Sequence, residues 1–267
     1  MQRRHPTRHL LVRGGVAAVA DALMLTGLYP WLPHALRVAR REAPPLRTAL
    51  GEWGWALAAS LARPLGFLPL PGANARGPRP IIVLHGYAMN RANFALLARR
   101  LAAAGLGPIY GFEYWSLGRT GRAARQLADF VGEVRAATGA SQVDVIGHSM
   151  GGVVGRYYVT LGGGDGAVAN LVTLGSPHRG TDLGAVGVGH ARRELVVGSR
   201  LLGRLANAPA PTQTRVTVVW SRADALVPGG RQSPIAGAET LLVDGIGHLG
   251  LLASRSVAGE IIARLKI

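Results

Sequence analysis

The chain of 267 residues contains no cysteine. This absence excludes a disulfide framework, a thiolate nucleophile and any metal site built from cysteines. Acidic residues are also few, 14 in total, so a metal site made from several carboxylates would be difficult to assemble. Charged residues make up only 16% of the chain and hydrophobic residues 48%, which excludes general disorder. The composition therefore indicates an apolar, folded protein without cysteine chemistry.

Lysine is almost absent as well. Lys266 is the only lysine, so 29 of the 30 basic residues are arginines, and the formal net charge is +16. Nucleic-acid binders gather such charge on one face, because it has to neutralise neighbouring phosphates. Here the arginines are scattered along the whole chain. We therefore expect no nucleic-acid partner, and we interpret the charge as a weak preference for anionic lipid surfaces.

Two regions of the chain differ in composition. Residues 1–79 contain a basic start, two apolar stretches and several prolines, and this region runs into the sequence PLPGANARGPRP, which is typical of a linker. Residues 80–267 are long enough for one large α/β domain with a buried core. The sequence thus predicts a main domain over 80–267, preceded by an apolar helical appendage.

The apolar stretches of the first region admit three interpretations. Residues 12–32 are about long enough to span a bilayer, but Arg13 and Asp21 interrupt them, and such charges cost about 2.5–3.5 kcal/mol each near a helix centre. The second stretch places Trp53 and Trp55 beside small apolar residues, which suits a membrane interface. Helices packed on the main domain, membrane association and a cleaved export signal all stay open, and the location of the protein stays open with them.

From Pro80 onward, short β-branched runs alternate with segments of helical spacing. Runs of this kind that end in a glycine turn are typical of buried parallel strands. Their alternation with helices predicts a mostly parallel sheet with helices on both faces. The predicted strands lie within 79–86, 107–114, 141–146, 167–177, 214–221 and 239–245, and the predicted helices are 93–104, 120–138 and one that begins at 153.

The pentapeptide GHSMG at 147–151 follows one of these strands and precedes a helix. In a G-x-S-x-G sequence at such a place, the serine occupies a strained strand-to-helix turn, and its neighbours must be small. Gly147, Gly151 and Gly152 meet that requirement. An ordinary glycine-rich turn would have the same letters, but the buried strand in front favours a nucleophile elbow with Ser149 as the nucleophile.

With this motif the chain resembles the α/β-hydrolase superfamily, in particular its bacterial lipases and esterases with a GHSMGG-like elbow. The resemblance covers residues 80–267. It implies an α/β-hydrolase fold with a mostly parallel central sheet, helices on both faces and a helical cap insertion. It also implies a catalytic triad at the carboxyl ends of the strands, in the chain order serine, acid, histidine.

A serine nucleophile needs a general base that a carboxylate holds in one tautomer. His248 lies in a glycine-flanked loop after the last predicted strand and matches the family's histidine, although it could also be only a residue of a helix-capping loop. Three other histidines lie in the appendage, one is too close to Ser149 along the elbow, and one falls in the predicted cap: His5, His9, His34, His148 and His190.

The acid of the triad has three candidates. Asp224 follows the predicted strand 214–221 and resembles the family's acid in a D-x-x-V-P string. Asp244 lies only four residues before His248 and is better suited to stabilising that loop, whereas Asp182 could cap the next helix. We expect Asp224 to be the acid and keep the other two as alternatives.

An ester hydrolase also needs N–H donors aimed at the developing oxyanion. One is the backbone N–H of Met150, directly after the nucleophile. The HG-x pattern of the family implies that the other is the backbone N–H of Tyr87. His85 could be mistaken for a base, but the resemblance implies a structural role for it.

The resemblance also raises calcium, which the larger bacterial lipases of the family bind through acidic loops near the catalytic histidine. Around His248 this chain offers only Asp244. We therefore expect no metal and no cofactor.

Residues 178–213 form an insertion with apolar residues spaced for one amphipathic helix. In the family such an insertion often forms a lid over the acyl pocket, although it could be a helical connection that never moves. The sequences GHSMGG and GSPHRG resemble those of lipases, which implies a carboxylic ester hydrolase acting on lipid or acyl esters. An acyltransferase that uses the same acyl-enzyme and a noncatalytic binding protein of this fold are the alternatives.

Overall fold

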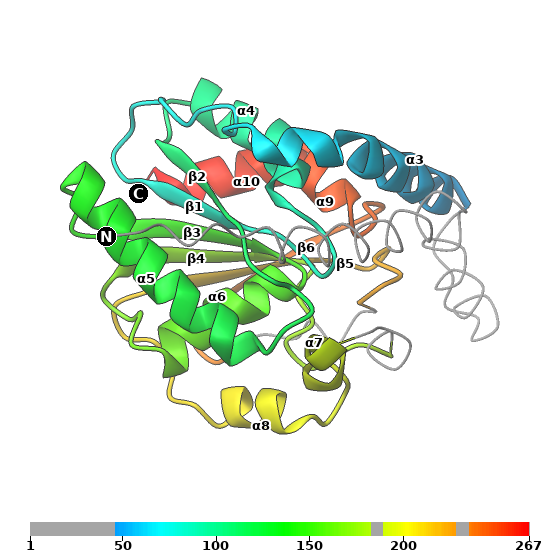
Figure 1. The fold of residues 1–267 in the computed structure, drawn as a ribbon. Helices are drawn as coiled ribbons and strands as arrows, with labels where there is room; N and C mark the ends of the chain where they lie inside the picture. Colours follow the sequence, from blue (N-terminus) through cyan, green and yellow to red (C-terminus); the bar gives the residue numbers. More distant parts are fainter. Residues whose placement is uncertain (1–45, 183–188, 228–234, 267) are drawn as a thin grey trace, which may run out of the picture.

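The computed structural model describes residues 46–182, 189–227 and 235–266. Within these residues the chain forms a six-stranded sheet with the strand order β2-β1-β3-β4-β5-β6 (Figure 1). All neighbouring strands pair in parallel, as the sequence predicted. The strands are β1 (Ile81–Leu84), β2 (Ile109–Phe112), β3 (Val143–His148), β4 (Val168–Leu174), β5 (Arg215–Ser221) and β6 (Glu239–Val243).

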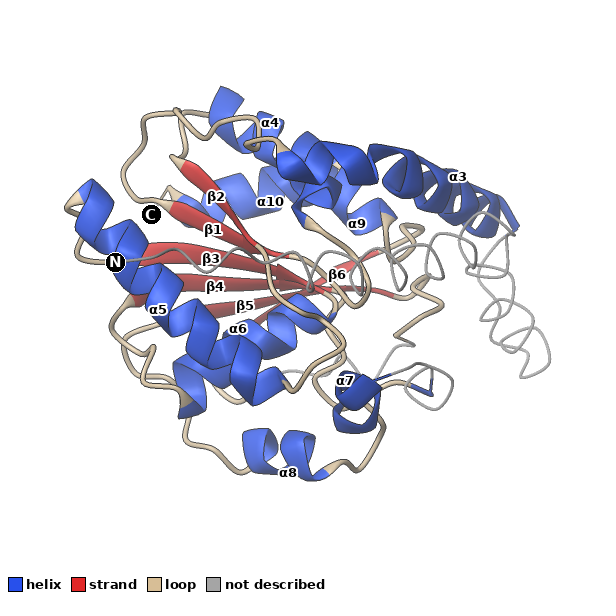
Figure 2. Cartoon of the chain, viewed as in Figure 1, coloured by secondary structure: helices blue, strands red, loops and turns tan. Residues whose placement is uncertain are grey.

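Helices cover both faces of this sheet (Figure 2). Parallel strands require crossover connections, and most of the helices lie in these crossovers. The helices are α3 (Leu46–Ala62), η1 (Arg63–Phe67), η2 (Arg91–Phe94), α4 (Ala95–Ala103), α5 (Thr120–Thr138), α6 (Met150–Leu161), α7 (Gly189–Glu194), α8 (Arg200–Ala206), α9 (Gly250–Ala253) and α10 (Arg255–Leu265).

The apolar core is divided by the sheet into two layers. One layer lies between the sheet and α5 and α6, and the other between the sheet and α4, α9 and α10. The strands β1, β3 and β4 are buried along their whole length, because they are covered on both faces. This explains why their sequences are continuous apolar runs rather than alternating ones.

Two sequence predictions about helices need correction. The helix expected to begin at Val153 begins at Met150, immediately after Ser149. The cap was expected to hold one amphipathic helix, but the described part of it holds two short ones, α7 and α8. Gly198 interrupts them with a positive φ of 76°, and Ser199 then starts α8 by accepting a hydrogen bond from a backbone N–H.

The second apolar stretch of the first region forms α3, η1 and the following turn, whereas the first stretch, 12–32, lies outside the described residues. Helix α3 lies beside α9 and η2. The segment that resembled a linker is hydrogen-bonded to the sheet, since the N–H of Ile109 donates to the carbonyl oxygen of Gly72 at 3.0 Å. No helix of the described residues is long and apolar enough to cross a membrane.

The carboxyl ends of the parallel strands meet at one edge of the sheet. The loops after β1, β3, β4, β5 and β6 therefore start close together. These five loops carry His85, Ser149, Gly175, Asp224 and His248 respectively. The topology thus gathers residues that are up to 163 positions apart in the sequence, from His85 to His248, at one place.

Candidate active site

Ser149 occupies the turn between β3 and α6. Its φ of 54° and ψ of −125° lie in a region that residues other than glycine rarely adopt. The turn is fixed to the neighbouring strand, because the N–H of Ser149 donates to the carbonyl oxygen of Leu174 at 2.8 Å. The serine is partly exposed, whereas Met150 after it is buried. This is the geometry of a nucleophile elbow, which holds the side chain out of the strand at the end of the sheet.

The glycines around the elbow are required by close backbone approach. A Cβ atom at Gly147 would lie 2.5 Å from the backbone nitrogen of Gly152. A Cβ atom at Gly151 would overlap the carbonyl oxygen of Leu84 in β1, and one at Gly152 would overlap the hydroxyl of Ser176. The elbow is therefore packed so tightly against two strands that no side chain fits at these three positions.

His248 and Asp224 form a buried pair. The ring nitrogen Nδ1 of His248 donates to Oδ2 of Asp224 at 2.7 Å, and the two residues are 2% and 0% exposed. The other carboxylate oxygen, Oδ1, accepts the N–H groups of Leu226 and Val227, both at 2.9 Å. Because a carboxylate only accepts hydrogen bonds, Nδ1 of His248 carries the hydrogen in the neutral ring. Nε2 is then the nitrogen that can accept a proton.

His148 joins the histidine loop to the elbow. Its Nε2 donates to the carbonyl oxygen of His248 at 3.0 Å, and the two rings lie 4.6 Å apart between centroids. His148 directly precedes Ser149, so this contact holds the loop of His248 beside the turn that carries the serine. At the end of β4, a Cβ atom at Gly175 would lie 2.9 Å from Oδ2 of Asp224 and 3.1 Å from Nδ1 of His248. The carboxylate–imidazole pair thus fills the space between three loops.

The surroundings of the two histidines shift their pKa values in opposite directions. Burial lowers the pKa of His248, but the charge and hydrogen bond of Asp224 and the charge of Glu52 outweigh it, so this pKa is raised above its usual value. Burial and the neighbouring charge of His248 hold the pKa of His148 well below its usual value. His148 therefore remains neutral, while His248 is the imidazole that can take up a proton.

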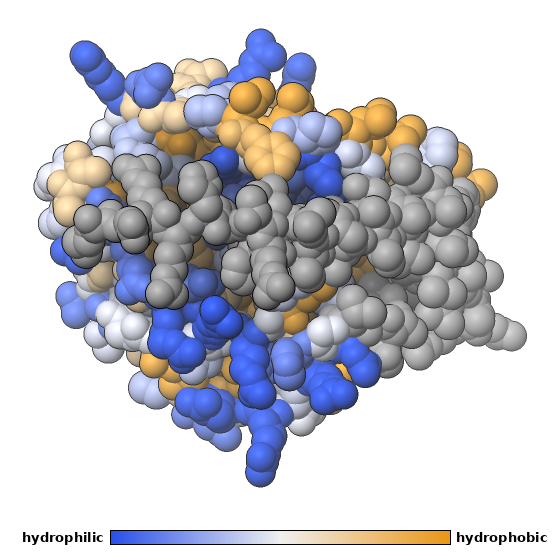
Figure 3. All heavy atoms as spheres, in the orientation of Figure 1, coloured by the Kyte–Doolittle hydropathy of each residue, from blue (hydrophilic) through white to orange (hydrophobic). Residues whose placement is uncertain are grey.

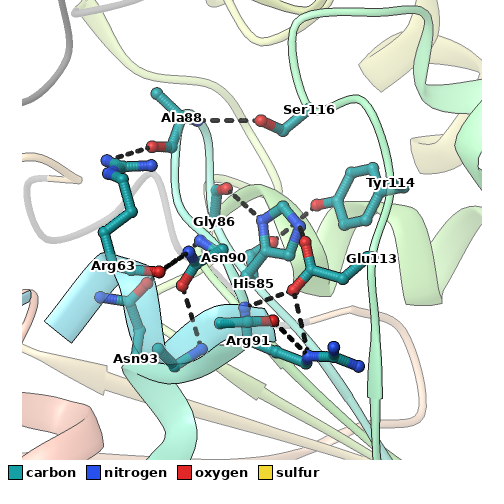
Figure 4. Close-up of polar contacts among 12 residues, drawn as sticks. Arg63, His85, Gly86, Ala88, Asn90, Arg91, Asn93, Glu113, Tyr114 and Ser116 are labelled. Atoms are coloured by element: carbon teal, nitrogen blue, oxygen red, sulfur yellow. Dashed lines mark hydrogen bonds and ion pairs between the residues drawn. The ribbon is translucent and has the colours of Figure 1, made fainter. Parts of the chain in front are cut away.

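The loop after β1, whose polar contacts are drawn in Figure 4, lies against the elbow. A Cβ atom at Gly86 would be only 3.1 Å from the Cβ atom of Ser149, so the following peptide, that of Tyr87, begins beside the serine. Ala88 has a positive φ of 55° and is held on both sides: its N–H donates to the hydroxyl of Ser116 at 2.9 Å, and its carbonyl oxygen accepts from Arg63 at 3.0 Å. The loop is thereby fixed in one conformation.

His85 is part of the support of this loop. Its Nδ1 donates to the carbonyl oxygen of Gly86 at 2.9 Å, and its ring stacks on that of Tyr114 with 4.5 Å between centroids (Figure 4). The hydroxyl of Tyr114 donates to the carbonyl oxygen of His85 at 2.6 Å. These are the contacts of a residue that shapes the loop.

The rival candidates lie outside the pair. The side chain of Asp244 is 67% exposed and makes an ion pair with Arg222 at 3.2 Å. Asp182 and His190 are also exposed. Among the described residues, no group of three histidine, cysteine, aspartate or glutamate side chains could hold a metal ion. Of the candidate acids, the structure brings only Asp224 against His248.

The described part of the cap is bonded to the helices beneath it. A carboxylate oxygen of Glu194 in α7 accepts the first N–H of α5, that of Thr120, at 2.7 Å. From α6, the buried guanidinium of Arg156 donates to the carbonyl oxygen of Leu205 in α8 at 2.8 Å. The cap therefore rests on α5 and α6, the helices on one side of the elbow.

One residue of the site escaped the sequence analysis. Glu52 of α3 is 7% exposed, and its carboxylate accepts the N–H groups of Leu249 at 2.9 Å and Gly250 at 2.8 Å, the residues directly after His248. A signal was present, because Glu52 is the only acidic residue between 46 and 79 and lies in an otherwise apolar stretch. An isolated acid in such a helix suggests a buried partner, but the sequence does not say which one.

Comparison with known proteins finds lipases. The family model described as Lipase (class 2) matches residues 78–191. A triacylglycerol lipase of Pseudarthrobacter phenanthrenivorans is 45% identical over 65 residues, which are 24% of this chain and 19% of that lipase. A triacylglycerol lipase of Burkholderia plantarii is also 45% identical over 65 residues, 24% of this chain and 17% of that lipase. The matched segment thus spans less than a fifth of these curated relatives.

Solved structures agree on the fold. The mature form of the Bacillus licheniformis lipase BlEst2 has a TM-score of 0.65 at 15% identity, over 74% of this chain and 94% of that chain. Lipase B of Aspergillus fumigatus has a TM-score of 0.61 at 13% identity, over 72% of this chain and 53% of that chain. The chain therefore has the α/β-hydrolase fold of these lipases, and both the predicted fold and the resemblance to bacterial lipases are confirmed.

The packing of the elbow leads to a test of stability. Gly151→Ala should lower the free energy of unfolding by about 3 kcal/mol, at the upper end of overpacking costs, because the new methyl group would overlap backbone atoms that cannot turn aside. Gly259→Ala is the matched control. Nothing lies within 4 Å of a Cβ atom there, so this change should stabilise α10 by about 0.5–1 kcal/mol. Urea denaturation of both variants measures the difference, and equal stabilities would contradict the described packing.

Proposed function

We propose that this protein is a serine hydrolase that cleaves carboxylic esters, in particular lipid or acyl esters, through a Ser149–His248–Asp224 triad. The observation that carries the proposal is the buried His248–Asp224 pair, with 2.7 Å between the bonded atoms, in a loop that His148 holds beside the strained serine turn. The match to Lipase (class 2) and the two triacylglycerol lipases support the same reaction class.

In the proposed acylation step, Nε2 of His248 takes the proton of the Ser149 hydroxyl as its oxygen attacks the ester carbonyl carbon. The carbonyl oxygen becomes an oxyanion, which accepts the backbone N–H groups of Tyr87 and Met150. The imidazolium then gives its proton to the leaving alcohol as the tetrahedral intermediate collapses to the acyl-enzyme. Asp224 keeps the ring in the required tautomer and stabilises the imidazolium.

Deacylation repeats these roles with water as the nucleophile. His248 takes a proton from water, the hydroxide oxygen bonds to the acyl carbon, and the proton returns to the Ser149 oxygen as the acid leaves. If an alcohol replaced water, the same acyl-enzyme would make a new ester, which is the acyltransferase alternative. Product analysis with p-nitrophenyl esters of increasing chain length separates them, since hydrolysis releases free acid even when an acceptor alcohol is present.

A lipid surface is the partner that we propose for α3 and η1. Large apolar side chains are exposed along this segment, with Phe67 78% and Leu61 71% accessible, and apolar atoms gather over α3 in Figure 3. A concentrated exposed apolar surface with tryptophans suits the boundary between water and lipid. The exposed large apolar residues of α3, η1 and the position directly after η1 are Leu46, Leu50, Trp53, Trp55, Leu61, Leu65, Phe67 and Leu68.

The nucleophile is tested by Ser149→Ala. The variant should fold normally but lose ester hydrolysis, because no acyl-enzyme can form without the hydroxyl. Intact-mass analysis after treatment with a fluorophosphonate should show one label on the native protein and none on the variant. Stoichiometric labelling that survives the substitution would place the nucleophile elsewhere.

Three Asp→Asn substitutions test which aspartate is the acid of the triad. Asp224→Asn should lower kcat by several orders of magnitude, on the order of 10⁴ as in the protease triad, because the imidazole loses both its tautomer and its counter-charge. Asp244→Asn and Asp182→Asn should change kcat little, since both side chains are exposed. Melting temperatures check that all three variants are folded. A collapse of kcat in either exposed variant, with Asp224→Asn near normal, would overturn the assignment.

The lipid surface is tested by the double variant Leu61→Ser and Phe67→Ser. Its binding to vesicles of anionic phospholipid should weaken at least about tenfold, because each side chain would lose on the order of 1 kcal/mol of burial. Hydrolysis of a soluble short ester should be unchanged. Leu161→Ser, an exposed apolar residue at the end of α6, is the control and should bind as the native protein does. Vesicle co-sedimentation measures both; equal binding of all three proteins would exclude this surface.

A further inference from the structure

Glu52 is a buried carboxylate that lies under the loop of the candidate base. It comes from α3, a helix that precedes the sheet, and it is 7% exposed. Its Oε2 accepts the N–H of Leu249 at 2.9 Å, and its Oε1 accepts the N–H of Gly250 at 2.8 Å. These N–H groups stand at the start of α9, so neither has a partner within that helix. The carboxylate therefore satisfies backbone groups that directly follow His248.

The loop is shaped to admit this side chain. A Cβ atom at Gly247 would overlap the carboxylate of Glu52, so a side chain on this side of His248 would displace Glu52. Ala56, one turn further along α3, packs against Leu249 in a small buried cluster. The loop from 247 to 250 is thus held from below by one face of α3. A small rotation of that loop would move the imidazole, because His248 lies between the two contacts.

The charge of Glu52 also reaches the imidazole. Both of its oxygens accept an N–H group, which is the pattern of an ionised carboxylate. Burial is the largest influence on Glu52 and leaves its pKa raised above the usual value; the two N–H bonds and the positive charge of His248 act in the opposite direction, and the charge of Asp224 adds to the rise. The ionisable groups around His248 are Asp224 after β5, Glu52 of α3 and His148 at the end of β3. The charge of His85, in the loop after β1, acts in turn on His148. With both oxygens bonded in this way, Glu52 is a second carboxylate near His248, and it comes from a helix before the sheet, whereas Asp224 follows β5.

We propose that Glu52 is a positioning residue for the proposed ester hydrolysis: it fixes the loop that carries His248 and adds a second negative charge that stabilises the imidazolium. Asp224 holds the ring directly, whereas Glu52 acts through the backbone of the next two residues and through space. This inference rests on the proposed function for its catalytic consequence. The effect on His248 itself can be measured without any turnover.

The experiment is an NMR titration of His248 in the full chain with ¹³C-labelled histidine, the signal being assigned by its loss in His248→Asn. Glu52→Gln should lower the pKa of His248 by at least about half a unit, because a negative charge that favoured the imidazolium is gone. Asp244→Asn removes a charge from the same loop at an exposed position and is the matched control. It should leave the titration unchanged.

The kinetic readout uses p-nitrophenyl esters. Glu52→Gln should lower kcat about tenfold with little change in KM, because the imidazolium forms in the transition state and not in the bound substrate. The acidic limb of kcat/KM against pH should move to lower pH, since His248 must be neutral to act as a base and its pKa falls. Glu52→Asp keeps the charge but cannot reach both N–H groups. It should keep the limb near its native position while losing part of kcat.

A purely structural role predicts a different pattern. The melting temperature of Glu52→Gln would fall, but the His248 titration and the acidic limb would stay where they are, and that result would overturn the proposal. Unfolding of both Glu52→Gln and Glu52→Asp would also overturn it, because Glu52 would then be a residue of the fold. If no ester is hydrolysed but the His248 titration shifts as expected, the proposed function fails while the electrostatic effect of Glu52 on His248 stands.

Discussion

The hydrogen bond between Asp224 and His248 is the constraint on which the rest of the site depends. A carboxylate that is 0% exposed is costly unless its oxygens are bonded, and here the imidazole and the two N–H groups of Leu226 and Val227 satisfy it. Those partners come from two loops, after β5 and after β6. Folding therefore has to bring both strand ends together before the charge can be buried, which couples the site to the parallel sheet.

The tightness of the packing follows from the same requirement. Glycines stand where loops approach the pair and the elbow, because a methyl group at Gly175 would crowd both members of the pair and one at Gly86 would crowd Ser149. The strained φ of Ser149 is maintained by its N–H bond to β4 and by the start of α6. The positions of the serine, the imidazole and the carboxylate are thus set by backbone contacts between strands and loops.

Local sequence patterns predicted most of the fold. Features that depend on contacts between distant residues could not be predicted from the sequence. Apolar runs and glycine turns predicted the parallel sheet, and the bounds of 120–138 agree with α5, because strand and helix periods are local properties. The break between α7 and α8 was missed because Gly198 and Ser199 lie in a segment with continuous helical spacing. Asp224 was named for its loop, and the structure adds its contact with His248. Glu52 could not be paired in advance, because its partners are about 200 positions away.

Helix α3 carries two separate features, an exposed apolar side and a buried carboxylate, within what the sequence analysis treated as one apolar stretch. One side carries the exposed apolar residues of the proposed lipid surface, and another carries Glu52 against the loop of His248. Deleting the whole first region would remove both together, so a loss of activity in such a variant could come from a displaced imidazole rather than from lost contact with lipid. Point substitutions separate the two, because Leu61 and Phe67 are exposed and Glu52 is buried. A lipid that contacted α3 would therefore lie on the same helix that carries Glu52 beneath the loop of His248.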